Sequence, residues 1–132
     1  MRPIKFRAWD TYSEAWLNDK IGIAMSGRMM YEGRPADGDD ALGHLAANIV
    51  IEQFTGLLDK NGKEIYEGDA ILCHDKMVGS VVRIVVWKQD ETMFALKNMA
   101  GAFHRFGWSP QGTDETMEII GNIHENPELL NP

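Results

Sequence analysis

The sequence predicts a mostly β protein, with an N-terminal β-hairpin lobe followed by a small antiparallel barrel. Two observations carry this prediction. Apolar and polar residues alternate near the N-terminus, which is the period of a half-buried strand. In the C-terminal half, five short β-rich runs are separated by turn signals. That spacing is typical of a small barrel rather than of a helical domain.

The first predicted strand covers residues 4–9 and has two different faces. The apolar face consists of Ile4, Phe6 and Ala8. The opposite face consists of Lys5, Arg7 and Trp9. Residues 10–14 form a predicted turn, and residues 15–17 begin the return strand of a hairpin. Because a two-stranded hairpin alone is marginal in water, we expect its apolar face to pack on a strand at residues 47–54.

The segment between these strands has a weak pattern. Residues 26–43 are rich in Gly, Asp and Met and contain a DGDD cluster, which predicts a long mobile loop. A short helix over residues 41–47, capped by Asp39 or Asp40, is an alternative that Gly43 weakens. The β-branched residues that follow favour the strand at 47–54.

Two turn signals enclose an apolar pair in the stretch "DKNGKEIYEGDAI", residues 59–71. Asn61 and Gly62 tolerate positive φ, and Asp59 can accept hydrogen bonds from nearby backbone amides. A Gly-Asp pair at 68–69 marks the second turn. The apolar pair, which we expect to plug one end of the barrel, is Ile65 and Tyr66. We interpret this stretch as the structural junction between an N-terminal lobe, residues 1–58, and a barrel with a C-terminal tail, residues 59–132.

The predicted barrel strands cover residues 70–74, 79–88, 92–97, 102–106 and 117–123. In the longest strand, alternation assigns one set of residues to the core face: Val82, Ile84 and Val86. The set assigned to the opposite face is Val81, Arg83, Val85 and Trp87. The tail is expected to form one helical turn that docks Leu129 and Leu130.

Composition excludes several classes of protein. The single cysteine, Cys73, allows no intramolecular disulfide. The N-terminus has no apolar run typical of a signal peptide, and no segment has the length of a membrane span, so we expect a cytoplasmic protein. The net charge is −7, and residues 67–132 carry 5 basic and 10 acidic side chains. Such a field repels the phosphates of nucleic acids unless a basic patch is present.

The sequence lacks residues that the common metal-binding and catalytic motifs require. An EF-hand loop starting at Asp59 would need an oxygen ligand where Lys63 stands and glutamate where Ala70 stands. Cys73 and His74 are neighbours on a predicted strand, so they point to opposite faces and do not readily share a zinc ion. Nucleophile and phosphate-loop motifs are missing from the sequence. We therefore expect no cofactor, no metal and no enzymatic activity. The weakest alternative is a hydrolase that uses the acidic pairs at 39–40 or 114–115.

Basic and aromatic residues share a face on two predicted strands, and these are the candidate binding residues: Lys5, Arg7, Trp9, Arg83 and Trp87. Cations beside aromatic rings hold single-stranded nucleic acid on small β-platforms. The alternative is that the rings are covered and the cations are paired within the protein, and the acidic net charge favours this alternative. A second aromatic cluster is expected to supply barrel core and one exposed ring: Phe103, Phe106 and Trp108.

Three segments resemble the YopX family of small proteins encoded by bacteriophages and prophages. They are "KFRAWD" at 5–10, "QFTGLLDKNGKEIYEGD" at 53–69 and "IIGNIHENPELL" at 119–130. The resemblance implies a mostly β protein whose C-terminal half is an SH3-like barrel, and a phage or prophage origin. It supplies no catalytic residues, since the family is largely uncharacterised.

The function expected from the sequence is that of a non-enzymatic phage or prophage accessory protein that acts through protein binding or self-association. The expected partner is a second copy of the chain, in a homo-oligomer, or a host or phage protein, and no membrane is expected. We place the self-association interface in residues 1–52. The alternative is a small-barrel nucleic-acid-binding protein that uses the stripe of Lys5, Arg7 and Trp9.

Overall fold

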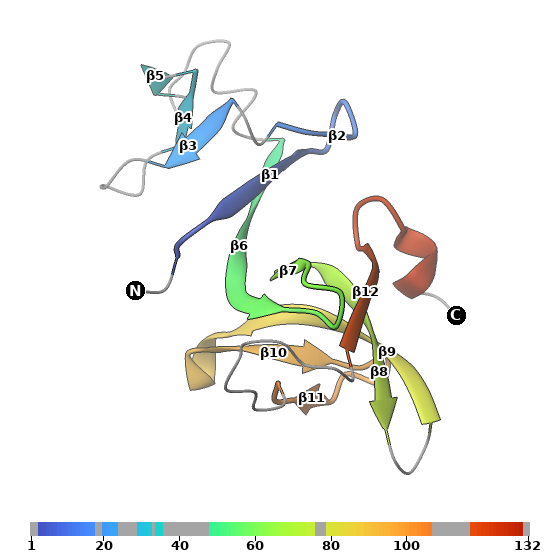
Figure 1. Ribbon diagram of the computed structural model, residues 1–132. Helices are drawn as coiled ribbons and strands as arrows, with labels where there is room; N and C mark the ends of the chain where they lie inside the picture. Colours follow the sequence, from blue (N-terminus) through green and yellow to red (C-terminus); the bar gives the residue numbers. More distant parts are fainter. Residues whose placement is uncertain are drawn as a thin grey trace. The chain divides into compact units, whose positions relative to one another are not determined.

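The computed structural model describes residues 3–17, 20–23, 29–32, 34–35, 48–75, 79–106 and 117–130. Within these ranges the chain forms β-strands and two 3₁₀ turns, and no α-helix (Figure 1). The predicted fold class, a mostly β protein with an N-terminal hairpin lobe and a small SH3-like antiparallel barrel, is confirmed. The chain divides into two compact units. We call Lys5–Gln53 the N-terminal unit, and Phe54–Pro132 together with Met1–Ile4 the barrel unit.

The N-terminal unit contains the expected hairpin. Its strands are β1 (Phe6–Asp10) and β2 (Ala15–Trp16), paired antiparallel with Trp9 opposite Trp16. The carboxylate of Asp10 fixes the turn, because it accepts hydrogen bonds from the backbone N–H of Tyr12 at 2.9 Å and from the hydroxyl of Ser13 at 2.7 Å. On its other side, β1 pairs antiparallel with the first part of β6 (Ile49–Leu58).

The predicted apolar face of the first strand is corrected in part. Ala8 is buried, but Phe6 is 42% exposed and Ile4 lies before the strand and is 72% exposed. The reason is the mode of contact with β6. The two strands are hydrogen-bonded neighbours in one sheet, with Ala8 opposite Ile51, rather than stacked face to face. A strand beside another covers its edge and leaves both faces to be covered by other elements.

Part of the predicted loop over residues 26–43 forms a second sheet in the N-terminal unit. Its three short antiparallel strands are β3 (Ile21–Ile23), β4 (Met29–Tyr31) and β5 (Arg34–Pro35). The loop prediction is wrong for β4 and β5, because strands of two or three residues are too short to show an alternating pattern. The alternative helix at 41–47 lies outside the described residues.

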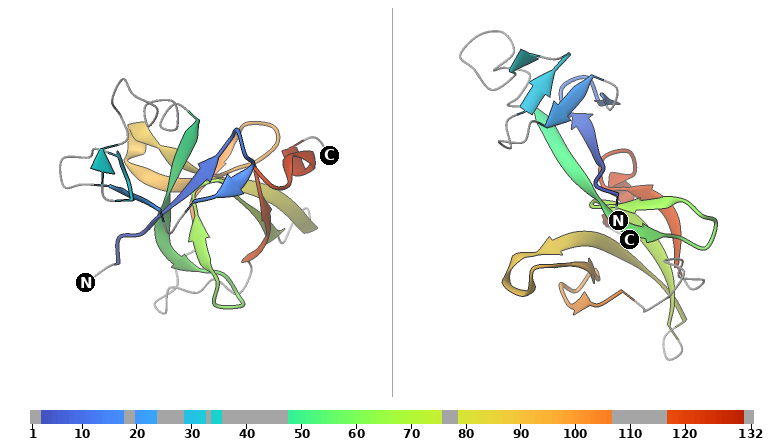
Figure 2. Two further views of the ribbon diagram at one scale, coloured as in Figure 1. Left: turned by 90° about the horizontal axis from the view of Figure 1, so that it is seen from above. Right: turned by 60° about the vertical axis from the view of Figure 1, so that its left-hand side comes forward.

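The barrel unit is built on a five-stranded antiparallel sheet with the order β11-β10-β9-β8-β12. The strands are β8 (Asp69–Asp75), β9 (Gly79–Lys88), β10 (Met93–Lys97), β11 (Phe103–His104) and β12 (Met117–Asn122). All five predicted strands are present, with ends shifted by a few residues. The sheet curls because β9 bends along its length (Figure 2), and a 3₁₀ turn, η1 (Gln89–Glu91), connects β9 to β10.

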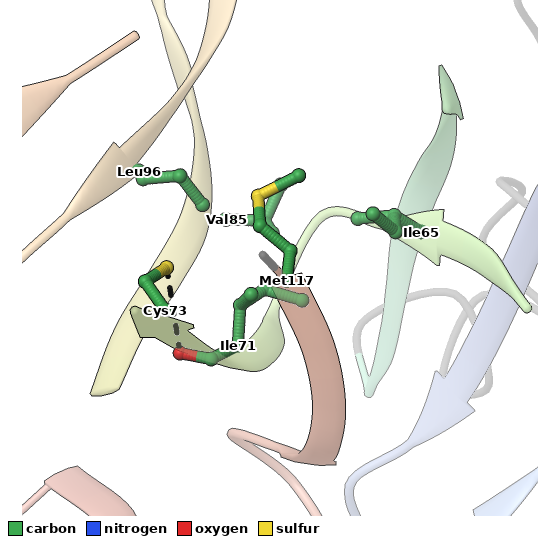
Figure 3. Packing of buried hydrophobic residues seen from close by; sticks show 6 residues of the cluster. All are labelled: Ile65, Ile71, Cys73, Val85, Leu96 and Met117. Atoms are coloured by element: carbon green, nitrogen blue, oxygen red, sulfur yellow. Dashed lines mark hydrogen bonds between the residues drawn. The ribbon is translucent and has the colours of Figure 1, made fainter. Parts of the chain in front are cut away.

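The core of the barrel unit is a cluster from five strands, shown in Figure 3: Ile65, Ile71, Cys73, Val85, Leu96 and Met117. The predicted core face of β9 is wrong, since Val85 belongs to this cluster and Val81 packs against it. Ile84, on the opposite face, is also buried. Both faces of β9 are covered at its middle, and the charged residue on the face that packs into the core, Arg83, is half-buried rather than exposed to solvent.

The turn at residues 59–63, within the barrel unit, is ordered by the fully buried carboxylate of Asp59. One oxygen, Oδ1, accepts hydrogen bonds from the backbone N–H groups of Asn61 and Lys63, both at 2.9 Å. The other, Oδ2, accepts a hydrogen bond from the backbone N–H of Ile119 in β12 at 3.0 Å. Burial raises the pKa of Asp59, but the three amide donors and the nearby charge of Lys63 outweigh it, so the pKa lies below its ordinary value.

The apolar pair between the two turns forms a short strand, β7 (Glu64–Tyr66), which pairs antiparallel with the second part of β6. Ile65 is fully buried in the core, and the ring of Tyr66 lies against Phe54 with centroids 5.6 Å apart. The second turn closes through Asp69, whose carboxylate accepts a hydrogen bond from the backbone N–H of Tyr66 at 2.8 Å. The stretch therefore forms two turns and a short strand, all within the barrel unit.

Gly62 has φ = +80°, and a Cβ added to it would meet no atom within 4 Å. Any penalty for a side chain is therefore conformational. We expect Gly62→Ala to lower the free energy of unfolding by about 1 kcal/mol and Gly62→Val by about 2–3 kcal/mol, because a β-branched residue is the more strained at positive φ. Thermal unfolding followed by circular dichroism measures both. Equal melting temperatures for the wild type and the two variants would contradict this explanation.

The C-terminal tail forms one 3₁₀ turn, η2 (Pro127–Leu130). The carbonyl oxygen of the buried Asn122 side chain accepts hydrogen bonds from the backbone N–H groups of His124 and Glu125, which turns the chain after β12. Leu129 is half-buried, whereas Leu130 is 40% exposed. The expected docking of two leucines is therefore correct for one of them.

Candidate functional site

The basic and aromatic stripe of β1 makes contacts inside the N-terminal unit. Arg7 Nε donates a hydrogen bond to Glu52 Oε1 at 2.9 Å, and the Arg7 guanidinium lies 4.6 Å from the ring centroid of Trp16. Trp9 is 7% exposed and packs edge-on against Trp16, with centroids 4.9 Å apart. Lys5 is exposed and precedes the strand. The cation of Arg7 and the ring of Trp9 thus already have partners within the unit.

The second stripe lies on β9 in the barrel unit. Arg83 is half-buried, and Trp87 is 43% exposed. The indole N–H of Trp87 donates a hydrogen bond to Gln89 Oε1 at 2.7 Å, and its ring packs edge-on against Phe94 at 5.1 Å. Of the five residues selected from the sequence, Trp87 is the one aromatic ring that presents a large exposed surface.

A further aromatic residue, Phe103, is 46% exposed, and two lysine side chains lie over its ring. Lys88 Nζ lies 4.9 Å and Lys97 Nζ 5.8 Å from its ring centroid. Lys88 is also bound to the carboxylate of Asp90, with both N–O distances at 2.8 Å, and this hydrogen bonding raises the pKa of Lys88. The neighbouring carboxylates offset much of the positive charge on this face. Phe106 packs against the core as expected, and Trp108 lies outside the described residues.

The described residues contain no group of three or more His, Cys, Asp or Glu side chains arranged to hold a metal ion. Cys73 is buried, while His74 is exposed and shares a hydrogen bond with the Ser80 hydroxyl at 2.9 Å, so the two neighbours face opposite sides of β8. The acidic pairs at 39–40 and 114–115 lie outside the described residues. In the described ranges, no helix has the length and apolar character of a membrane span.

Sequence reasoning missed an apolar cavity of about 430 Å³ in the barrel unit. It is lined by Val81, Val82, Asn98, Met99, Ala100, Glu128 and Leu129. These residues come from β9, from the turn after β10 and from η2. Because these segments are far apart in the sequence, no local pattern predicts the cavity. The only related expectation is that the C-terminal leucines dock, and Leu129 does line the cavity.

A smaller cavity, of about 130 Å³, lies in the N-terminal unit. It is lined by Phe6, Arg7, Ala8, Ile21, Gly22, Ile23 and Ile51. Of the large apolar side chains that line it, Phe6 and Ile23 are the most exposed, at 42% and 37%. We call these two residues and this cavity the N-terminal apolar face.

Comparison with known proteins gives a family but no activity. The profile of the family described as YopX protein matches residues 5–131. A similar solved structure is the crystal structure of protein EF1440 from Enterococcus faecalis, with a TM-score of 0.59 and 24% sequence identity. The match covers 99% of this chain and 100% of that one. At this identity the likeness shows the fold alone. No curated protein matches the chain.

Proposed function

This chain belongs to the YopX family, and from that premise we propose that it is a non-enzymatic accessory protein of a phage or prophage. It acts by binding protein in the cytoplasm of the bacterial host, and its first partner is a second copy of itself. The observation that carries the proposal is the N-terminal apolar face, where Phe6 and Ile23 border a small cavity and stay partly exposed. Adjacent exposed apolar side chains favour contact with another protein.

Nucleic acid is the less favoured partner. The guanidinium of Arg7 is hydrogen-bonded to Glu52, and the ring of Trp9 packs against Trp16. These contacts within the protein argue against nucleic-acid binding by the stripe. Binding to single strands needs cations for phosphates and open rings for bases. The net charge of −7 adds repulsion to any such contact.

Self-association predicts a dimer, because two-fold closure is the commonest symmetry of homo-oligomers. We expect sedimentation velocity at micromolar concentration to find the dimer for the wild type. A charge placed in the interface should raise the dissociation constant, so we expect Phe6→Lys to raise it at least about tenfold. Tyr12→Lys is the matched control, since Tyr12 is 87% exposed in the hairpin turn and does not border the cavity. A wild type that sediments as a single monomeric species refutes the proposed dimer.

A further inference from the structure

The larger apolar cavity has the character of a binding site. Its volume of about 430 Å³ lies within the range of roughly 300–1,000 Å³ common for ligand pockets. Five of its seven lining residues are apolar: Val81, Val82, Met99, Ala100 and Leu129. The other two, Asn98 and Glu128, supply an amide and a carboxylate. All seven belong to the barrel unit.

The cavity lies beside a sheet edge that β10 leaves open. The last residue of β10 to pair with β9 is Lys97, opposite Ile84. The chain then turns away at Asn98, whose backbone N–H donates a hydrogen bond to the carbonyl of Ala102 and whose Oδ1 accepts one from the N–H of Ala102, both at 2.9 Å. Strand β9 continues to Gly79, paired with β8 on its other side. In the described part of the chain, no strand pairs with β9 on the β10 side before Ile84.

Backbone alternation shows which groups point toward this edge. The carbonyl of Val85 accepts a hydrogen bond from the N–H of Gly68, the residue before β8, at 2.8 Å, so the backbone groups of Val85 point to the β8 side. In an antiparallel strand, successive residues direct these groups to opposite sides. Two and four residues away from Ile84, Val82 and Ser80 therefore direct their N–H and C=O groups away from β8, beside the cavity that Val82 lines.

We propose that this site binds an extended segment of a partner protein as an added strand along Ser80–Val82. One apolar side chain of the segment enters the cavity, and a lysine or arginine of the segment lies beside Glu128. In binding by strand addition, main-chain hydrogen bonds give affinity and a pocket for alternate side chains gives specificity, and both parts are adjacent here. The inference deepens the proposed protein-binding function and rests on it, but it uses a different surface from the N-terminal apolar face.

The charge of the segment follows from the charges at the site. Glu128 is exposed at the cavity, and residues 67–132 carry 5 basic and 10 acidic side chains. Opposite charge across an interface speeds encounter and excludes partners of the wrong sign. A basic, apolar segment therefore fits the site, and an acidic one does not.

The probe is a capped, fluorescein-labelled nonapeptide in which lysine alternates with valine around a central leucine, followed by fluorescence anisotropy. We expect saturable binding to the wild type, and binding at least about tenfold weaker for the same peptide with glutamate in place of lysine. Methylation of alternate backbone nitrogens should abolish binding, because it removes the donors of the added strand. Equal binding of the methylated peptide would overturn strand addition and leave a pocket for an apolar group alone.

Three substitutions test whether the peptide binds in the cavity. Ala100→Trp fills the cavity from an exposed position, and we expect it to weaken peptide binding at least about tenfold. Ala102→Trp is the control, since Ala102 is exposed two residues away and does not line the cavity, and it should stay within about twofold of the wild type. Glu128→Lys should exchange the preference between the lysine and glutamate peptides. Melting curves establish that each variant is folded.

The outcomes separate this inference from the proposed self-association. A wild type that forms the dimer but binds neither peptide, or a peptide bound equally by the wild type and Ala100→Trp, overturns the cavity inference alone. A monomer that binds the lysine peptide refutes the dimer and supports the cavity. Loss of the dimer in Ala100→Trp would show that a second copy occupies the cavity, and this also overturns the partner segment named here.

Discussion

Replacing Asp59 with alanine is expected to lower the free energy of unfolding of the barrel unit by about 3–5 kcal/mol, because three backbone donors lose a charged acceptor. The side chain is fully buried, so water does not take its place without rearrangement of the turn. Urea unfolding followed by circular dichroism measures the change. Asn61→Ala is the control. The Asn61 side chain is exposed, and only its backbone N–H bonds to Asp59, so a change under about 0.5 kcal/mol is expected.

The same carboxylate makes a prediction about pH. The pKa of Asp59 is lower in the folded protein than in the unfolded chain, so its ionised form stabilises the fold. This stability is present above the unfolded value of about 4 and is lost as the pH falls through the folded value. The difference in stability between the wild type and Asp59→Asn should therefore shrink as the pH falls below about 4. A constant difference from pH 7 to acid would show that the charge of Asp59 contributes nothing.

Replacing Ile65 with alanine is expected to cost about 2–5 kcal/mol of unfolding free energy, since the side chain is fully buried in the core cluster and its removal leaves a cavity. Ile65→Val removes one methylene group and should cost about 0.5–1.5 kcal/mol. The matched control is Ile120→Ala, because Ile120 is 38% exposed on β12 and is not part of the cluster. If Ile65→Ala were as stable as Ile120→Ala, the pair at 65–66 would be only a surface turn and not part of the barrel core.

The parts of the fold that the sequence could predict are those with local causes. The hairpin at β1 and β2 and the five barrel strands follow from alternation and from turn residues, and Gly62 has the positive φ that its turn requires. The faces of β9 could not be predicted, because valine and isoleucine occupy both sides of a strand that is covered on both sides at its middle. The sheet of β3, β4 and β5 has strands too short for any period to show.

The candidate sites also include one that the sequence could predict and one that depends on the fold. The stripe of Lys5, Arg7 and Trp9 was visible because alternation puts the three on one face. Whether its members contact the protein or solvent depends on Glu52 and Trp16, which approach only in the folded unit. The apolar cavity depends on three segments that meet in space, so it is a property of the fold that no single stretch of sequence contains.

The position of Asp59 has a consequence for solubility. Strand β12 is the last of its sheet, and an uncovered last strand recruits strands from other molecules and seeds aggregation. Here the carboxylate of Asp59 accepts the hydrogen bond of the Ile119 N–H, and the N–H of Lys60 donates to the carbonyl of Met117 at 2.9 Å. The turn thus stands in for a neighbouring strand over these two residues. The ionised side chain of Asp59 and the backbone amide of Lys60 therefore reduce the tendency of β12 to pair with a strand of another molecule, which is the first step of fibre growth.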